Sequence, residues 1–234
     1  MTDNRLTIEA LTSGYGETDI LQGVALTLRR GEILALMGRN GMGKTTLLKT
    51  VMGLIQTRAG RIMLDGSPVD GKPPAWLLAH GVGYAPQELP LFQDLSIRDN
   101  LRLALRHDRD LAKALQNVGR SFPFLLERLE QLAGTLSGGE QKMLILARAL
   151  MNEPDLLLID EISEGIQPSV VQRIATALKT ERERRGISIL VVEQNLDFAL
   201  SVADRWAVMK LGQIVDEGAC NAESRETVLK HLSI

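Results

Sequence analysis

A glycine-rich segment at residues 38–45 constrains the fold of this chain more than any other feature. It follows the pattern G-x-x-x-x-G-K-[ST], and its residues are Gly38, Arg39, Asn40, Gly41, Met42, Gly43, Lys44 and Thr45. The apolar run before it predicts a buried strand at residues 33–37, and residues 46–52 continue as a helix that Gly53 can close. Such a turn directs backbone amides toward an anion at the positive end of a helix. The segment therefore predicts a phosphate-binding loop.

The last residues of this loop add chemistry that a plain glycine turn between strand and helix does not need. Lys44 supplies a point charge for the terminal phosphates of a nucleotide, and the Thr45 hydroxyl is suited to ligate magnesium. We expect Thr46, the next residue, to contact the nucleotide as well. ATP and Mg²⁺ are the predicted cofactors.

The composition fits one globular α/β domain and argues against several other classes. A chain of 234 residues can bury one large core, and a formal net charge of −2 argues against a nucleic-acid binder. The single cysteine, Cys220, excludes an internal disulfide and a cysteine-cluster metal site. No stretch approaches the roughly 20 apolar residues of a membrane span, so any membrane role must come through a partner.

Apolar periodicity divides the chain into an alternating strand and helix pattern with a helical middle. Strands are predicted at residues 6–11, 24–28, 33–37, 61–64, 82–85, 156–159, 187–192, 206–209 and 213–216. Helices are predicted at residues 170–185, 196–203 and 223–232, and Asp65-Gly66 predicts a hairpin turn. We expect a single domain over residues 1–234, in which residues 1–86 and 152–234 form a parallel α/β core and residues 87–151 form an inserted helical subdomain.

A second motif, Leu136-Ser137-Gly138-Gly139-Glu140-Gln141, lies in this helical middle. Ser137 can cap a helix that starts at Gly138, which leaves the Gly138 and Gly139 amides free to meet an anion. A helix cap alone is the alternative explanation. Together with the phosphate loop, the motif resembles the signature of the ATP-binding cassette superfamily. The resemblance implies a P-loop core with a mostly parallel sheet, an N-terminal antiparallel portion and a helical subdomain, and it implies that Ser137, Gly138, Gly139 and Gln141 face a nucleotide bound by the opposite subunit.

Four further positions match the same family in chain order. Tyr15, between Gly14 and Gly16, matches the aromatic residue that stacks on adenine, although a tyrosine there can also be a simple turn residue. The resemblance implies that Gln87 contacts magnesium and water and links the core to the helical subdomain. It implies that Asp160 holds magnesium and that Glu161 is the general base for the attacking water. An acidic pair at the carboxyl end of a buried strand is where open α/β sheets bind ligands.

The chain departs from the family in three places, the first being Ile162-Ser163 after Glu161, where most cassette ATPases read Pro-Thr or Pro-Ser. Gln167 stands where an aspartate often organises the dimer interface, and Gln194 stands at the expected position of the switch histidine. An amide can donate a hydrogen bond to a phosphate oxygen but cannot carry a proton. We therefore hypothesise that Gln194 is a catalytic-site residue that senses the γ-phosphate as a neutral donor; the alternative is that it only caps the next helix.

Short strings narrow the resemblance to one branch. Glu193-Gln194-Asn195 is similar to the ATPases of branched-chain amino acid uptake systems, and residues 39–43 with residues 164–169 are closer to their urea-uptake relatives. The resemblance implies an ATP-hydrolysing subunit at the cytoplasmic face of the inner membrane. Its implied partners are a second, different cassette in a head-to-tail dimer, two membrane-spanning permease subunits and, indirectly, an external solute-binding protein. We expect the permease to dock between residues 87 and 103, where residues 89–92 carry apolar side chains; internal packing of that stretch is the alternative.

Cassette ATPases of other classes remain alternatives. Those of chromosome and DNA-repair machines contain long coiled coils, and ribosome-acting factors carry two cassettes, whereas this chain has neither sustained heptads nor a second cassette. A degenerate cassette that binds ATP without turnover is suggested by Gln167 and Gln194, and the intact Lys44, Asp160 and Glu161 argue against it.

Overall fold

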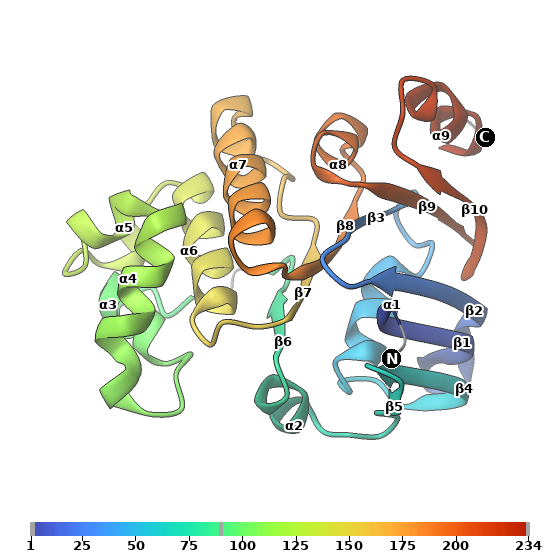
Figure 1. Cartoon of the computed structure of the whole chain (residues 1–234), viewed down its shortest axis with the longest axis horizontal. Coiled ribbons are helices and arrows are strands. Elements are labelled where there is room, and N and C mark those ends of the chain that lie inside the picture. The colour runs from blue at the N-terminus through green and yellow to red at the C-terminus, as the bar shows by residue number, and fades with distance from the viewer. Residues whose placement is uncertain (1–2, 89–90, 233–234) are drawn as a thin grey trace.

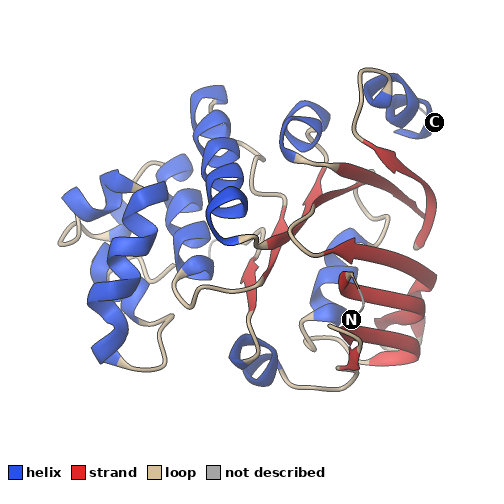
Figure 2. Cartoon of the chain, viewed as in Figure 1, coloured by secondary structure: helices blue, strands red, loops and turns tan. Residues whose placement is uncertain are grey.

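The computed structural model describes residues 3–88 and 91–232, which form two β-sheets and the helices that cover them. Figure 1 shows the antiparallel sheet at one end of the molecule, the larger sheet through the middle and a group of helices at the other end. Figure 2 shows most of the helices around the larger sheet and at the far end, with one helix beside the antiparallel sheet. The α/β class predicted from the sequence is confirmed.

The larger sheet has six strands in the order β10-β9-β3-β8-β7-β6. Their bounds are β3 Ile33–Met37, β6 Val82–Ala85, β7 Leu156–Asp160, β8 Ser188–Glu193, β9 Arg205–Lys210 and β10 Gln213–Ala219. Neighbouring strands from β9 to β6 are parallel, and β10 pairs with β9 in the antiparallel direction. Every residue of β3, β7 and β8 is buried, as strands covered on both faces require.

The smaller sheet is antiparallel, in the order β2-β1-β4-β5. Its strands are β1 Asn4–Tyr15, β2 Thr18–Arg29, β4 Thr57–Leu64 and β5 Ser67–Pro68. The predicted hairpin turn is confirmed, because Asp65 and Gly66 join β4 to β5 with φ of 51° and 77°. β1 is longer than predicted because irregularities in its pairing with β2 break the alternation of buried and exposed residues on which the prediction depended.

Helix α1 (Lys44–Val51) lies between the two sheets (Figure 1). Leu47 and Leu48 join one hydrophobic cluster with Leu34 and Leu36 of β3 and with the inner face of the smaller sheet. The opposite face of the larger sheet carries α7 (Pro168–Arg185), α8 (Leu196–Val202) and α9 (Ser224–Leu232). Since side chains alternate along a strand, β3 contributes to clusters on both faces and anchors the loop that follows it.

The helical middle predicted from the sequence is present between β6 and β7. It consists of α3 Ile97–Arg102, α4 Leu111–Ser121, α5 Pro123–Glu127, α6 Gly138–Leu150 and two single-turn 3-10 helices. Leu101 of α3 and Leu115 of α4 are buried in a cluster that also holds Ile159 of β7 and Val191 of β8. The helices therefore share a core with the sheet. The short helix α2 (Pro74–Ala79) was not predicted.

Candidate nucleotide site

The loop at residues 38–43 joins the end of β3 to the start of α1, as the sequence predicts. Two of its glycines are required by the backbone. A Cβ atom on Gly38 would lie 2.5 Å from the carbonyl oxygen of Met209, and Gly43 has a φ of 105°, which side-chain-bearing residues rarely adopt. The loop is therefore held against β9 while α1 starts with its free amides directed toward the loop.

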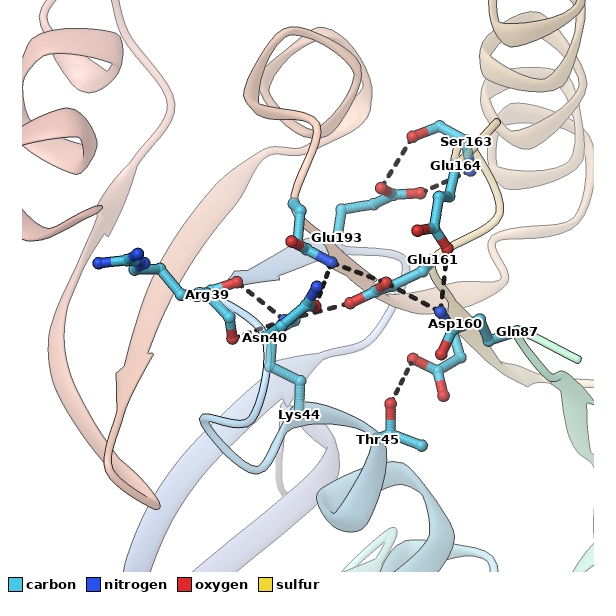
Figure 3. A network of polar contacts seen from close by, with 12 residues as sticks. Arg39, Asn40, Lys44, Thr45, Gln87, Asp160, Glu161, Ser163, Glu164 and Glu193 are labelled. Atoms are coloured by element: carbon cyan, nitrogen blue, oxygen red, sulfur yellow. Dashed lines mark hydrogen bonds and ion pairs between the residues drawn. The ribbon is translucent and has the colours of Figure 1, made fainter. Parts of the chain in front are cut away.

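Lys44 reaches back over the loop in the structure. Its Nζ donates to the carbonyl oxygens of Gly38 at 2.8 Å and Arg39 at 3.2 Å, and it lies 3.1 Å from Oε1 of Glu161. The Lys44 side chain is only 4% exposed and that of Glu161 only 5%. A buried cation is thus already positioned where the loop would hold an anion. The Arg39 side chain points away from this group of residues (Figure 3).

A hydrogen bond between Thr45 and Asp160 is a second polar contact of α1, beside the Lys44–Glu161 pair. The Thr45 hydroxyl donates to Oδ1 of Asp160 at 3.1 Å. Asp160 is fully buried, and its Oδ2 has no hydrogen-bond partner within the described part of the chain. Burial, opposed by the Thr45 hydrogen bond, raises the pKa of the Asp160 carboxyl to about 6. An unpartnered buried carboxylate oxygen beside a hydroxyl is a hard donor set that suits Mg²⁺.

Glu161 collects polar contacts from three separate segments (Figure 3). Besides Lys44, its Oε2 accepts from Nε2 of Gln87 at 3.2 Å and from Nε2 of Gln194 at 2.8 Å. Gln87 also donates to Glu164 at 3.0 Å. Of the residues that the sequence placed in catalytic roles, Lys44 and Gln194 therefore both contact Glu161, at the carboxyl ends of β3, β7 and β8.

A cavity of about 390 Å³ opens beside this cluster. Its lining residues are Tyr15, Ile20, Asn40, Gly41, Gly43, Lys44, Thr45, Thr46, Gln87 and Glu161. The Tyr15 ring is 51% exposed, so it is available to stack on a planar group. Nine of these ten were expected from the sequence; Ile20, an ordinary apolar residue of β2, carried no signal. Gly38, Arg39, Met42 and Gln141 lie outside the lining, although Gly38 and Arg39 offer carbonyls to Lys44.

The signature residues lie at the N-terminus of α6 and do not line this cavity in the part of the chain that the structure describes. Ser137 caps α6 in a capping box with Glu140, and hydrogen bonds from the Ser137 backbone and hydroxyl hold the pKa of the Glu140 carboxyl below its usual range. Gly138 is exposed, and a Cβ atom on it would meet open space. Gln141 turns away from this end and donates to the Ala133 carbonyl at 3.2 Å.

The alternative role for Gln194, capping the following helix, is wrong. Asn195 is the N-cap of α8, and its side chain accepts from the Phe198 amide at 3.2 Å. Gln194 instead donates to Glu161 and to the side chain of Asn40 in the loop. Its amide therefore connects the end of β8 with the loop after β3.

Comparison with known proteins agrees with this geometry. Residues 21–164 match the family described as ABC transporter. The chain belongs to the ABC transporter family. One similar protein is the high-affinity branched-chain amino acid transport ATP-binding protein BraG of Pseudomonas aeruginosa, which is 38% identical over 92% of this chain and 93% of that protein.

Two further comparisons bear on the fold and on the breadth of the family. The lipopolysaccharide export system ATP-binding protein LptB of Escherichia coli K12 is 34% identical over 91% of this chain and 90% of that protein. The crystal structure of an ATP-binding cassette of an ABC transporter in its ADP conformation superposes with a TM-score of 0.88 at 26% identity, covering 98% of this chain and 96% of that one. The chain is an ATP-binding cassette of this family.

Proposed function

We propose that this chain energises a membrane importer for a small polar solute by hydrolysing ATP. The observation that carries the proposal is that Lys44, Thr45 and Glu161 line one cavity at the carboxyl edge of the sheet, with buried Asp160 hydrogen-bonded to Thr45. In this arrangement Lys44 and the loop amides bind the phosphates and Tyr15 stacks on the adenine. Glu161 accepts a proton from the attacking water, and Gln194 donates to a γ-phosphate oxygen.

Thr45, Asp160 and Gln87 are the residues proposed to hold Mg²⁺. The ion supplies charge stabilisation of the phosphates during phosphoryl transfer. Support comes from the orphaned Oδ2 of buried Asp160, since such an atom is costly unless it gains a partner. Gln87 lies at the end of β6, where its amide already contacts Glu161, so it is suited to orient water beside that carboxylate.

The chain is proposed to work in a head-to-tail dimer with a second cassette, which the branch resemblance suggests is a different chain. The support is the exposure of Ser137 and Gly138 at a helix N-terminus that is not part of the chain's own cavity. An amide-rich helix end stabilises an anion brought to it, so a partner's γ-phosphate is a suitable occupant. Each nucleotide then bridges both cassettes. Loss of the γ-phosphate loosens the dimer because the nucleotide no longer binds the closed state more tightly than the open one.

Two permease subunits are the proposed membrane partners, and a solute-binding protein acts through them. An open cavity of about 410 Å³ lies beside β6 and includes Leu78 and Leu103, which are 47% and 56% exposed. Phe92 is 54% exposed as well, while Leu91 packs against the core, and residues 89–90 lie outside the described residues. No helix among the residues described is long and apolar enough to cross a bilayer. We propose docking at residues 87–103, on the cytoplasmic face of the inner membrane.

This surface also fits the proposed division of the chain. Residues 1–86 and 152–234 are proposed as the core and residues 87–151 as the helical subdomain, so the docking segment lies where the two meet. Phe92→Asp replaces an exposed aromatic ring with a charged carboxylate. It should prevent co-purification of the permease without unfolding the cassette. Retained membrane assembly with lost hydrolysis would contradict docking at this site.

The proposed solutes are branched-chain amino acids and urea. BraG supports branched-chain amino acids, and the strings at residues 39–43 and 164–169 resemble urea-uptake ATPases. The similarity to LptB, which belongs to an export system, makes export the alternative direction of transport. The assembled transporter with its binding protein, tested for stimulation of ATP turnover by urea, leucine and acetamide in turn, distinguishes these solutes. Absence of stimulation by all of them would count against the import proposal.

The second candidate function is a cassette that binds ATP and assembles with little turnover. The observation in its favour is Gln194, which cannot take up a proton. Single-turnover hydrolysis by the purified cassette pair separates the two, with Glu161→Gln as the matched control. A wild-type rate no faster than that of Glu161→Gln would support the passive cassette.

A further inference from the structure

Lys142 is a buried cation that none of the motifs above explains. It lies in the first turns of α6, close after Ser137 and Gly138, and is 9% exposed. Its Nζ donates to the backbone carbonyl oxygen of Glu161 at 3.1 Å. Burial lowers the pKa of its ammonium group, and the nearby carboxylates of Glu164, Glu193 and Glu161 oppose that shift. A lysine in such a place is costly to bury unless it has a specific partner.

The carbonyl that Lys142 holds belongs to a residue in an unfavourable backbone conformation. Glu161 has a φ of 46°, in the left-handed region that a residue with a side chain rarely adopts. Its N–H donates to the Val192 carbonyl at 2.9 Å, and its carbonyl also accepts from the Glu164 amide at 3.4 Å. The left-handed turn reverses the chain directly after β7. That reversal directs the Glu161 carboxylate to Lys44 and the cavity.

The other side of the same loop is fixed from the end of β8. The Glu193 carboxylate accepts from the Ser163 amide at 2.9 Å and from its hydroxyl at 2.8 Å (Figure 3). Glu193 is 1% exposed, and burial raises the pKa of its carboxyl. The loop at residues 161–163 is thus held between a lysine of α6 and a glutamate of β8. These three hydrogen bonds oppose relaxation of the strained turn.

We propose that Lys142 is a positioning residue for ATP hydrolysis, which fixes the Glu161 backbone so that its carboxylate faces the attacking water. The inference rests on the proposed function of this cavity. A charge-assisted hydrogen bond is stronger and shorter than a neutral one, so an ammonium restrains the carbonyl more firmly than an amide can. Ser137 caps α6 and Lys142 follows it on the same helix. The bond from Lys142 therefore connects the chain's own Glu161 with the end of α6, which is proposed to meet the partner's nucleotide.

Lys142→Met tests the role, because methionine keeps the length and volume of the side chain but has no N–H. We expect kcat of the purified cassette pair to fall about tenfold or more, as a displaced catalytic group produces. KM and the affinity for a nonhydrolysable ATP analogue should stay within about twofold, since Lys44 and the loop are untouched. Lys142→Arg should restore most of kcat, because a guanidinium also donates to a carbonyl. Lys179→Met removes an exposed lysine from α7 and should change neither quantity.

Three outcomes would overturn the inference. The first is a folded Lys142→Met with wild-type kcat; the second is a loss of nucleotide affinity in parallel with kcat, which would indicate a purely structural role. If Lys142→Met does not fold, Ser163→Ala removes the Glu193 hydroxyl bond on the other side of the loop and should lower kcat at constant KM. An unchanged kcat in Ser163→Ala is the third outcome that would overturn the inference. A wild-type pair no faster than Glu161→Gln would instead refute both this role and the proposed ATPase.

Discussion

The buried ion pair between Lys44 and Glu161 competes with ATP for the same lysine. Nζ lies 3.1 Å from Oε1, so phosphate binding has to replace a carboxylate at Nζ. We predict that Glu161→Gln, which keeps the shape of the side chain and removes its charge, binds ATP more tightly than the wild type. The loss of like-charge repulsion between Glu161 and the γ-phosphate acts in the same direction.

The expected size follows from the geometry. Two unit charges at this separation attract by about 5 kcal/mol at an effective dielectric constant of about 20. Desolvation of both buried groups offsets most of that attraction. Hydrogen bonds from Gln87 and Gln194 to Glu161 remain possible in the glutamine variant. A net effect of about 1.5 kcal/mol, the low end of the range for a hydrogen bond to a charged group, makes ATP binding about tenfold tighter.

Two measurements check this competition. Equilibrium titration with a fluorescent ATP analogue gives the affinity, and urea unfolding of Lys44→Met, Glu161→Gln and the double variant gives the coupling between the two side chains. Glu164→Gln is the charge-matched control, because Glu164 is an exposed neighbour that accepts from Gln87 and does not pair with Lys44. Additivity of the two unfolding free-energy changes within about 0.5 kcal/mol, with unaltered ATP affinity in Glu161→Gln, would refute the reasoning.

Three further predictions concern single positions. Gln194 should contribute no titration to the wild-type rate, so any wild-type step near pH 6 belongs to Asp160, whose pKa is about 6, and Gln194→His should add a further imidazole step near pH 6.5; a wild-type step that disappears in Gln194→Ala would contradict this. Gly138→Ala should leave the melting temperature unchanged, because its Cβ meets open space, yet lower hydrolysis by the pair through the dimer interface; full activity would argue against that interface. Burial, reinforced by Asp204, raises the pKa of the Cys220 thiol to about 11, so the thiolate is scarce at pH 8 and alkylation by iodoacetamide should accelerate as the pH rises toward 11. Labelling at pH 8 as rapid as that of free cysteine would be inconsistent with it.

Local signals predicted the elements that are continuous in sequence and buried on both faces. β3, β7 and β8 are unbroken apolar runs, and α6 begins at its capping serine. The full length of β1 was not predictable in the same way, since its pairing irregularities disturb the alternation that marks a half-buried strand. The short helix α2 starts at consecutive prolines and is too short to show periodicity.

The sequence by itself determined the phosphate loop and the acidic pair at the end of β7, because each depends on residue type at a fixed local spacing, and its resemblance to a known family implied the roles of Tyr15, Gln87 and Gln194. Only the tertiary structure decided what these side chains touch. Thr45 meets Asp160 across 115 positions, Gln194 meets Glu161 while Asn195 takes the cap, and Lys142 finds the Glu161 carbonyl. Strand order and helix packing bring these partners together, and both depend on the whole core. No local sequence pattern therefore specifies such contacts.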